Sequence, residues 1–196
     1  MYKDYIGKFL EEQNRITEQI IAEQSDVINN MIEIVQDVKK KKGRVFIIGI
    51  GGGSGSGSHA TCDFNKIGGV STSNLSDNPT LFTALANDEG WDSVFWRQME
   101  MHHFGQNDCI LVFSVGGGNP NVSSNLMAAV DYAKKQGGRV IGVIGNDQGH
   151  TAKEGHAVVV VPLKHDDRRT PHTENFQMIL NHLIVNAIAT DGTWTE

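Results

Sequence analysis

Two glycine-rich segments, each directly after a run of apolar residues, restrict most strongly what this chain can fold into. The first covers residues 49–58 (GIGGGSGSGS) and follows the apolar run at 44–49. The second covers residues 114–121 (SVGGGNPN) and follows the apolar run at 108–114. Each segment leads into a stretch with helical patterning. Repeated strand–loop–helix units with continuous apolar strands predict a parallel sheet that helices cover on both faces.

The remaining patterns extend this alternation along the chain. Strands are predicted at residues 44–49, 70–75, 108–114, 139–145 and 157–161, and helices at 58–67, 79–87, 91–101, 121–136 and 172–190. Residues 3–42 place aliphatic side chains at helical spacing without strand signals, which predicts one long helix or two helices. A length of 196 residues suits one domain. We therefore expect a single domain over 1–196, with N-terminal helices at 1–42 and an α/β core at 43–196.

Composition narrows the functional classes. The formal net charge of -6 argues against general binding of nucleic acid, which requires a basic face. No stretch reaches the roughly 20 apolar residues of a membrane span, and the first residues lack the apolar core of a signal peptide. Cys62 and Cys109 lie far apart and have no CxxC partner. We expect a reduced, cytoplasmic protein without a cysteine metal site and without nucleic-acid or membrane partners.

The glycine segments themselves predict an anion site. Six glycines at positions 49–57 remove side chains, so that backbone N–H groups and the start of the next helix can surround an anion. A flexible tight turn is the alternative for one such segment, but two segments at equivalent positions favour the anion site. Neither segment is a P-loop, because no Gly-Lys-Ser/Thr follows, and the dinucleotide fingerprint fits poorly.

Four side chains in two predicted helices form a candidate chemical site. His59 and Asp63 are four residues apart and share a helix face beside the first glycine segment. Glu174 and His182 are eight residues apart, about two turns, on one side of the last helix. Imidazole and carboxylate ligands of this kind can hold Zn²⁺ or a similar ion, or can act as base and acid without metal. Alternatively, both histidines have structural roles only.

At these residues the chain resembles the SIS (sugar isomerase) domain family, and within it the sedoheptulose 7-phosphate isomerases, also called phosphoheptose isomerases. The similarity rests on Gly49-x-Gly-Gly-Gly, on Ser58-His59, on Asn87-Asp88-x-Gly90, on Ser114 and on His182. It covers nearly the whole chain. The resemblance implies a tetramer with sites where subunits meet. We expect a flavodoxin-like five-stranded parallel sheet with helices on both faces and an added N-terminal helical pair.

The resemblance also assigns roles to single residues. The family has a histidine at His59, a glutamate base at Asp63, a glutamine at Glu174 and a catalytic histidine at His182, and some members bind zinc there. In the second segment, Gly116 and Asn119 stand where the family has serines. Asp88 is a candidate for bonding to substrate hydroxyls. The candidate substrate and phosphate residues are Gly52, Gly53, Ser54, Ser56, Asp88, Ser114, Gly116, Gly117, Asn119 and Glu174.

The chemistry implied is aldose–ketose isomerisation of a ketose phosphate such as sedoheptulose 7-phosphate through an enediol. Asp63 is the expected carbon base and His182 the expected acid/base at oxygen. His59 and Glu174 would orient them or hold a metal that polarises the carbonyl. Two alternatives stay open: a non-catalytic SIS module that binds a sugar phosphate or a protein, and an isomerase for a different sugar phosphate.

Overall fold

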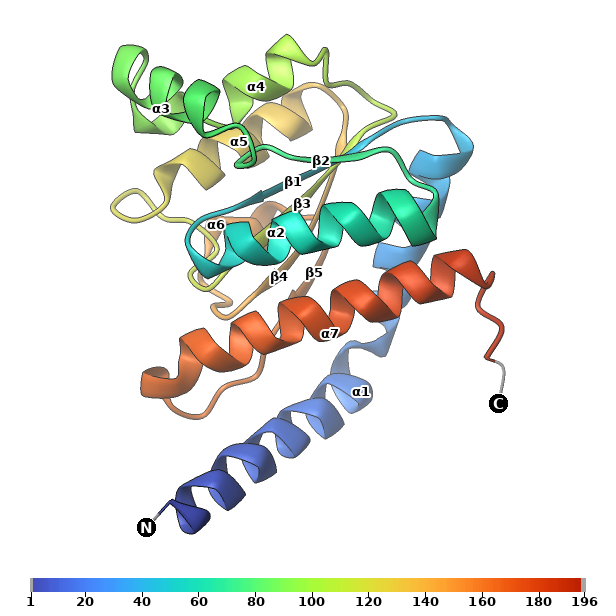
Figure 1. Cartoon of the computed structure of the whole chain (residues 1–196), viewed down its shortest axis with the longest axis vertical. Helices are drawn as coiled ribbons and strands as arrows, with labels where there is room; N and C mark the ends of the chain where they lie inside the picture. The colour runs from blue at the N-terminus through green and yellow to red at the C-terminus, as the bar shows by residue number, and fades with distance from the viewer. Residues whose placement is uncertain (1, 195–196) are drawn as a thin grey trace.

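The computed structural model describes residues 2–194, so that Met1 and residues 195–196 of the predicted domain lie outside the described part. One sheet contains all five described strands, and every pairing in it is parallel (Figure 1). The strands are β1 (Val45–Gly49), β2 (Thr72–Asn74), β3 (Cys109–Ser114), β4 (Arg139–Ile144) and β5 (Ala157–Val160). Their order, β2-β1-β3-β4-β5, is the flavodoxin order, which confirms the predicted fold class.

The central strands are buried on both faces, as their continuous apolar sequences predict. Every residue of β1 and of β3 is buried. Gly49 at the end of β1 pairs with Phe113 near the end of β3, so that the two glycine-rich segments begin side by side. The chain order reverses between these two strands, and open α/β sheets bind ligands in the crevice at that point.

Helices cover both faces of the sheet and enclose two separate apolar cores (Figure 1). One core packs α1 (Lys3–Lys40), α2 (Gly52–Asp63) and α7 (Arg169–Ala189) against alternate strand residues such as Ile47 and Leu111. The other packs α3 (Pro79–Asp88), α4 (Trp96–Met101) and α5 (Ser124–Lys135) against Phe46 and Ile110. The alternation follows from the pleat of the strands, which directs successive side chains to opposite faces.

The N-terminal region is one helix, which corrects the expected helical pair. α1 runs over 38 residues without a break and is therefore about 57 Å long. From Ile16 onward it buries side chains on the domain, among them Ile20, Met31 and Val35. Its first turns extend past the body of the molecule, where Ile6 and Leu10 are more than half exposed (Figure 1).

Several boundaries differ from the sequence predictions. α2 begins at Gly52 rather than at residue 58, so most of the first glycine-rich segment is helix. It continues through a π-helical turn, η1 (Phe64–Gly68). The predicted helix at 91–101 is split into η2 (Trp91–Ser93) and α4, and α5 begins three residues later than predicted. Two short helices, α6 (His150–Glu154) and η3 (Asp166–Arg168), carry no clear sequence signal.

Close packing explains why a helix can be so rich in glycine. A Cβ on Gly53 would lie 2.5 Å from the carbonyl oxygen of Phe113 in β3, and a Cβ on Gly57 would lie 3.1 Å from Ile47 in β1. Gly53 and Gly57 are four residues apart in α2 and thus share one helical face. Gly51 starts the helix with φ of 61°, in the left-handed region that favours glycine. These glycines allow α2 to lie directly on the sheet.

Two further findings bear on the sequence predictions. Within residues 2–194, no helix combines the length and the apolar character needed to cross a lipid bilayer. Cys62 is exposed and Cys109 is buried, and both are free thiols. Burial raises the pKa of the Cys109 thiol far above its usual range, so this side chain stays protonated and unreactive.

Alanine substitutions at two glycines of α2 should separate packing from helix propensity. We expect Gly53→Ala to destabilise the fold by about 1–3 kcal/mol, because its Cβ would collide with backbone of β3. Gly55→Ala should stabilise it by about 0.5–1 kcal/mol, because nothing lies within 4 Å of its Cβ and alanine favours helix. Urea unfolding of both variants measures the difference. Equal stabilities would contradict the close-packing account.

Candidate active site

The candidate site lies between α2 and α7, which run side by side in the same direction (Figure 1). At the start of α2, Gly52 faces Glu174 in the second turn of α7. At the end of α2, Asp63 accepts a hydrogen bond from Asn181. The two helices therefore bring the residues around Asp63 and His182 together.

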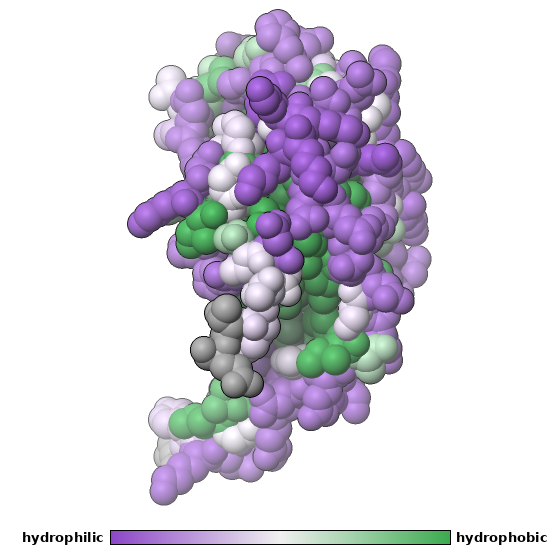
Figure 2. Space-filling view, turned by 90° about the vertical axis from the view of Figure 1, so that its right-hand side faces the viewer, coloured by the Kyte–Doolittle hydropathy of each residue, from purple (hydrophilic) through white to green (hydrophobic). Residues whose placement is uncertain are grey.

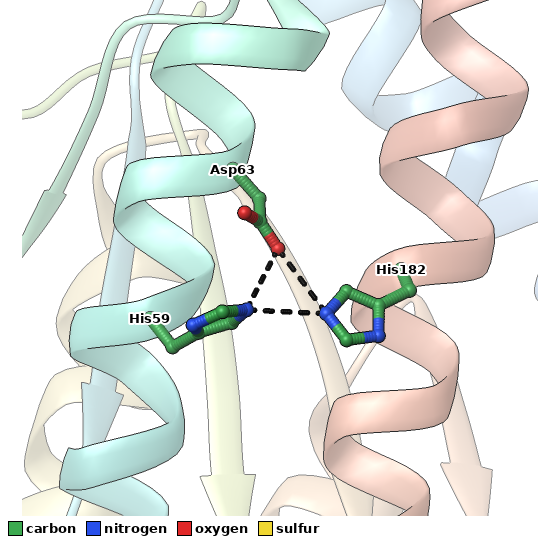
Figure 3. Close-up of side chains that lie close together, drawn as sticks. All are labelled: His59, Asp63 and His182. Carbon is green, nitrogen blue, oxygen red and sulfur yellow. Dashed lines mark hydrogen bonds and ion pairs between the residues drawn. The ribbon is translucent and has the colours of Figure 1, made fainter.

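Three of the four predicted side chains converge on one point (Figure 3). The Nε2 atom of His59 lies 3.1 Å from Oδ2 of Asp63 and 3.1 Å from Nε2 of His182. The Nε2 atom of His182 lies 3.5 Å from the same Oδ2. The His59–Asp63 pair follows from their spacing of four residues in α2, and α7 adds the third member. We call His59, Asp63 and His182 the triad.

The triad is half open to solvent. The side chains of His59 and His182 are 53% and 54% exposed, whereas that of Asp63 is 12% exposed. A substrate can therefore reach both imidazoles while the carboxylate is held between the helices. Two Nε2 atoms at 3.1 Å can share one proton, with one ring donating and the other accepting, but they cannot both carry a proton along that line.

The donor set also fits a divalent metal ion. Zinc in proteins is bound by imidazole nitrogen and carboxylate oxygen at about 2.0–2.2 Å, and tetrahedral geometry then places neighbouring ligand atoms about 3.3 Å apart. The three separations in the triad, 3.1, 3.1 and 3.5 Å, match the edges of one tetrahedral face. Such a face leaves one position open, as catalytic zinc sites require.

Glu174 does not join this group. Its carboxylate lies against Gly52, where an added Cβ would be 2.2 Å from Oε1 of Glu174. The structure thus places Glu174 at the start of α2, about two turns along α7 from His182, and the metal-ligand set predicted from sequence is reduced to three residues. At the start of α2 the carboxylate lies near the positive end of the helix dipole, where negative charge is favourable.

The second glycine-rich segment is a turn held by its own residues and by α6. Oγ of Ser114 accepts a hydrogen bond from the backbone N–H of Gly117 at 3.0 Å. The carbonyl of Gly117 in turn accepts from the hydroxyl of Thr151 in α6 at 2.8 Å. Oδ1 of Asn119 accepts from the backbone N–H groups of Asn121 and Val122. Ser114 and Asn119 therefore shape this loop, because their side chains accept hydrogen bonds from nearby backbone N–H groups.

The other candidate residues occupy three places. Gly53 is buried against the sheet, whereas Ser54 and Ser56 are half-buried in the first turns of α2. Gly116 is half-buried in the second loop. Asp88 lies at the exposed end of α3, where its carboxylate accepts a hydrogen bond from the Asn87 side chain at 2.7 Å. The structure brings the two loops to one edge of the sheet and gives Asp88 no contact with the triad.

Sequence reasoning missed two residues that support the site, Asn181 and Thr151. Asn181 donates to the triad carboxylate, and Thr151 holds the second loop. The available signal for Asn181 was a polar residue in the aliphatic stretch 179–185, which has no role in an apolar core. Thr151 lies in a helix of five residues and carries no pattern of its own.

The fold and the site together define a flavodoxin-like α/β protein with glycine-rich loops at the sheet edge and a His/Asp cluster between two helices. A family model described as the SIS domain matches residues 8–145, and the chain belongs to that family. This confirms the resemblance drawn from the two loops and the N-terminal helix.

Named relatives agree with this assignment. A phosphoheptose isomerase of Helicobacter pylori (strain P12) is 24% identical over 193 residues, which are 96% of this chain and 96% of the relative. A solved phosphoheptose isomerase of Francisella tularensis superposes with a TM-score of 0.85 at 18% identity, covering 97% of this chain and 99% of the other. A solved phosphoheptose isomerase of Neisseria gonorrhoeae superposes with a TM-score of 0.84 at 20% identity, covering 96% of this chain and 99% of the other.

Two serines at the loops should respond differently to alanine substitution. We expect Ser114→Ala to destabilise the ligand-free protein by about 1–3 kcal/mol, because the buried N–H of Gly117 loses its acceptor. Ser56→Ala should leave stability unchanged or raise it by a few tenths of a kcal/mol, since alanine is the better helix former. Thermal unfolding followed by circular dichroism gives both values. A neutral Ser114→Ala would contradict the role assigned to this hydroxyl.

Proposed function

We propose that this protein is a sugar-phosphate isomerase that interconverts a ketose phosphate and its aldose phosphate through an enediol, with sedoheptulose 7-phosphate as substrate. The observation that carries the proposal is the triad, where a buried carboxylate and two accessible imidazoles meet at one point. Membership of the SIS domain family and the names of the relatives support the same reaction. A binding module needs no such combination of base, acid and imidazoles.

In this proposal Asp63 removes the proton from the carbon next to the carbonyl. Its Oδ2 is occupied by His59, His182 and Asn181, whereas the contacts drawn in Figure 3 leave Oδ1 for the substrate. His182 then moves a proton between the two substrate oxygens with its exposed ring, because the carbonyl and hydroxyl exchange places in the reaction. His59 orients His182 through their Nε2 contact.

We further propose that the triad holds Zn²⁺. Support comes from the donor types, from their separations and from the open fourth position. His59, Asp63 and His182 would be the ligands through two Nε2 atoms and Oδ2, replacing the contact that the two rings make without metal. Oδ1 of Asp63 and Nδ1 of His182 would then remain for the proton transfers. Bound zinc supplies Lewis-acid polarisation of a substrate carbonyl, which makes the neighbouring C–H more acidic. Glu174 is left out of the ligand set and is assigned to a substrate hydroxyl near the start of α2.

The length of α2 supports a long sugar phosphate. Gly52 and His59 are seven residues apart, so about 10 Å of helix separates the start of α2 from the triad. Bonds in an extended chain advance about 1.2 Å each, and seven bonds from C2 to phosphorus in a heptulose 7-phosphate therefore cover about 8 Å. The three bonds of a triose phosphate cover about 4 Å and cannot connect the two ends.

The phosphate would bind where the two loops meet at the ends of β1 and β3. Backbone N–H groups at Gly52 and Gly53 start α2 without a side-chain cap, and this end carries positive dipole. Ser54 and Ser56 offer hydroxyls on the same turns. Across the crevice, Gly116 of the second loop would face the phosphate, while Gly117, Ser114 and Asn119 shape the loop. Asp88, on its exposed helix end, stays a candidate for substrate hydroxyls supplied across a subunit boundary.

An assembly of subunits, a homotetramer in the proposal, would complete this site. Figure 2 shows apolar side chains gathered in a hollow on the face that carries the end of α7. There a pocket of about 530 Å³ is lined by His182, Leu183 and Trp194 among others, so the triad borders an apolar surface. Ile6 and Leu10 of α1 are also exposed. Contact between copies would bury these side chains. We place the protein in the cytoplasm, as its composition indicates.

The reaction can be tested directly by NMR. Purified protein incubated with sedoheptulose 7-phosphate in D₂O should form an aldose phosphate that carries deuterium at C2. Asp63→Ala and His182→Ala should each lower turnover by at least about 100-fold, because each removes a group that transfers a proton. Asp26→Ala, at an exposed residue of α1 with no role in the proposed site, is the control. Binding of the substrate without any exchange in the wild type would favour the non-catalytic SIS module. Exchange with a different sugar phosphate only would identify the other alternative.

Metal binding by the triad gives a separate prediction. We expect the protein to bind one Zn²⁺ per chain in a chelator-competition titration. His59→Ala should weaken binding strongly, because it removes one of three ligands. His165→Ala, at an exposed loop residue, is the matched control and should bind zinc like the wild type. Identical affinities of wild type and His59→Ala would place any bound zinc elsewhere.

A further inference from the structure

Asn181 lies next to His182 in α7, but its side chain points to the interior. The residue is 1% exposed, and its Nδ2 donates a hydrogen bond to Oδ2 of Asp63 at 2.8 Å. This is the carboxylate oxygen that both imidazoles of the triad face. Asn181 is therefore the one described neighbour that reaches this oxygen from the buried side.

The orientation of the amide follows from chemistry. A carboxylate accepts hydrogen bonds, so the group that faces Asp63 must be the NH₂ end of the amide. That orientation leaves Oδ1 of Asn181 buried, without a partner among the described residues. A buried acceptor without a partner is unfavourable, and an apolar side chain of similar size would avoid that cost. The benefit of the asparagine must lie in its donor.

We propose that Asn181 is a positioning residue that holds the Asp63 carboxylate in the orientation needed to bind a divalent cation with His59 and His182. The inference rests on the proposed metal site. The side chain of Asp63 is 12% exposed and lies against both imidazoles of the triad. The amide donor stabilises the charged carboxylate and fixes the rotation that directs Oδ2 between the two rings. The three ligand atoms are then preorganised before the ion arrives.

Asn181 acts only through Asp63. Being buried, it cannot touch a substrate, and its Nδ2 has no lone pair with which to bind a metal ion. Asn181 thus hydrogen-bonds to Asp63, a proposed metal ligand, without binding the metal ion itself. Removal of such partners typically weakens metal binding by about 10–100-fold. We therefore expect substitution of Asn181 to weaken metal binding while the number of protein ligands stays at three.

The test compares Zn²⁺ affinity of the full chain in two variants. Asn181→Leu removes the donor with a branched apolar side chain that is somewhat larger. Asn181→Ser shortens the side chain so that it no longer reaches Asp63, and it adds no bulk. Asn175→Ser, at an exposed asparagine two turns earlier in α7, is the matched control. Affinity is measured by competition with a chelator, melting temperature without metal is measured in parallel, and the visible spectrum of bound Co²⁺ reports ligand geometry.

We expect both Asn181 variants to bind Zn²⁺ about 10–100-fold more weakly than the wild type, with an altered Co²⁺ spectrum and one ion per chain. The control should match the wild type in all three measurements. If Asn181→Leu does not fold, Asn181→Ser decides. A folded Asn181 variant with wild-type affinity and spectrum overturns this inference and leaves the proposed function standing. A wild-type chain that binds neither ion overturns the metal site and this inference together.

Discussion

The contact between α2 and the sheet sets the position of every other part of the site. Gly53 and Gly57 allow the helix to rest on β3 and β1 at distances that no side chain would permit. Because α2 lies close to the sheet, α7 can pack beside it on the same face of the sheet. The start of α2 is then fixed at the ends of β1 and β3, and its last turn is fixed against the middle of α7. One packing constraint thus places both ends of the candidate site.

The two parallel helices divide the site into two regions with different chemistry. At the start of α2, free backbone N–H groups and a glycine surface suit an anion. At its end, Asp63 is held between helices and faces two imidazoles. Because the spacing is set by a rigid helix, the proposed site would select substrates by the distance between their phosphate and their carbonyl. Rigid elements hold such distances better than loops do.

Much of this arrangement was predictable from the sequence, because its signals are local. The apolar runs and the glycines after them predicted the parallel sheet and its fold class, and the spacing of His59 and Asp63 predicted their contact. The start of α2 at Gly52 was not predictable, since glycine normally disfavours helix and only contact with β3 explains it. The place of Glu174 was missed for the same reason: spacing along α7 shows the face it shares with His182, but not that Gly52 lies opposite. The role of Asn181 was not predictable from the sequence, because it depends on the hydrogen bond from its side chain to Asp63 in another helix.

The separation of the two regions also bears on how this chain differs from the family pattern. The resemblance implies serines at Gly116 and Asn119, and these differences would change the proposed phosphate region without touching the triad. It also implies a glutamate at Asp63, so the carboxylate at the other end would be the shorter one, and Asn181 hydrogen-bonds to it from the buried side. Each region can therefore change while the other keeps its geometry, since α2 links them only through its length. In the proposed site, substrate binding at one end of the helix pair could change while the proton chemistry at the other end is kept, and one fold can in this way serve several functions.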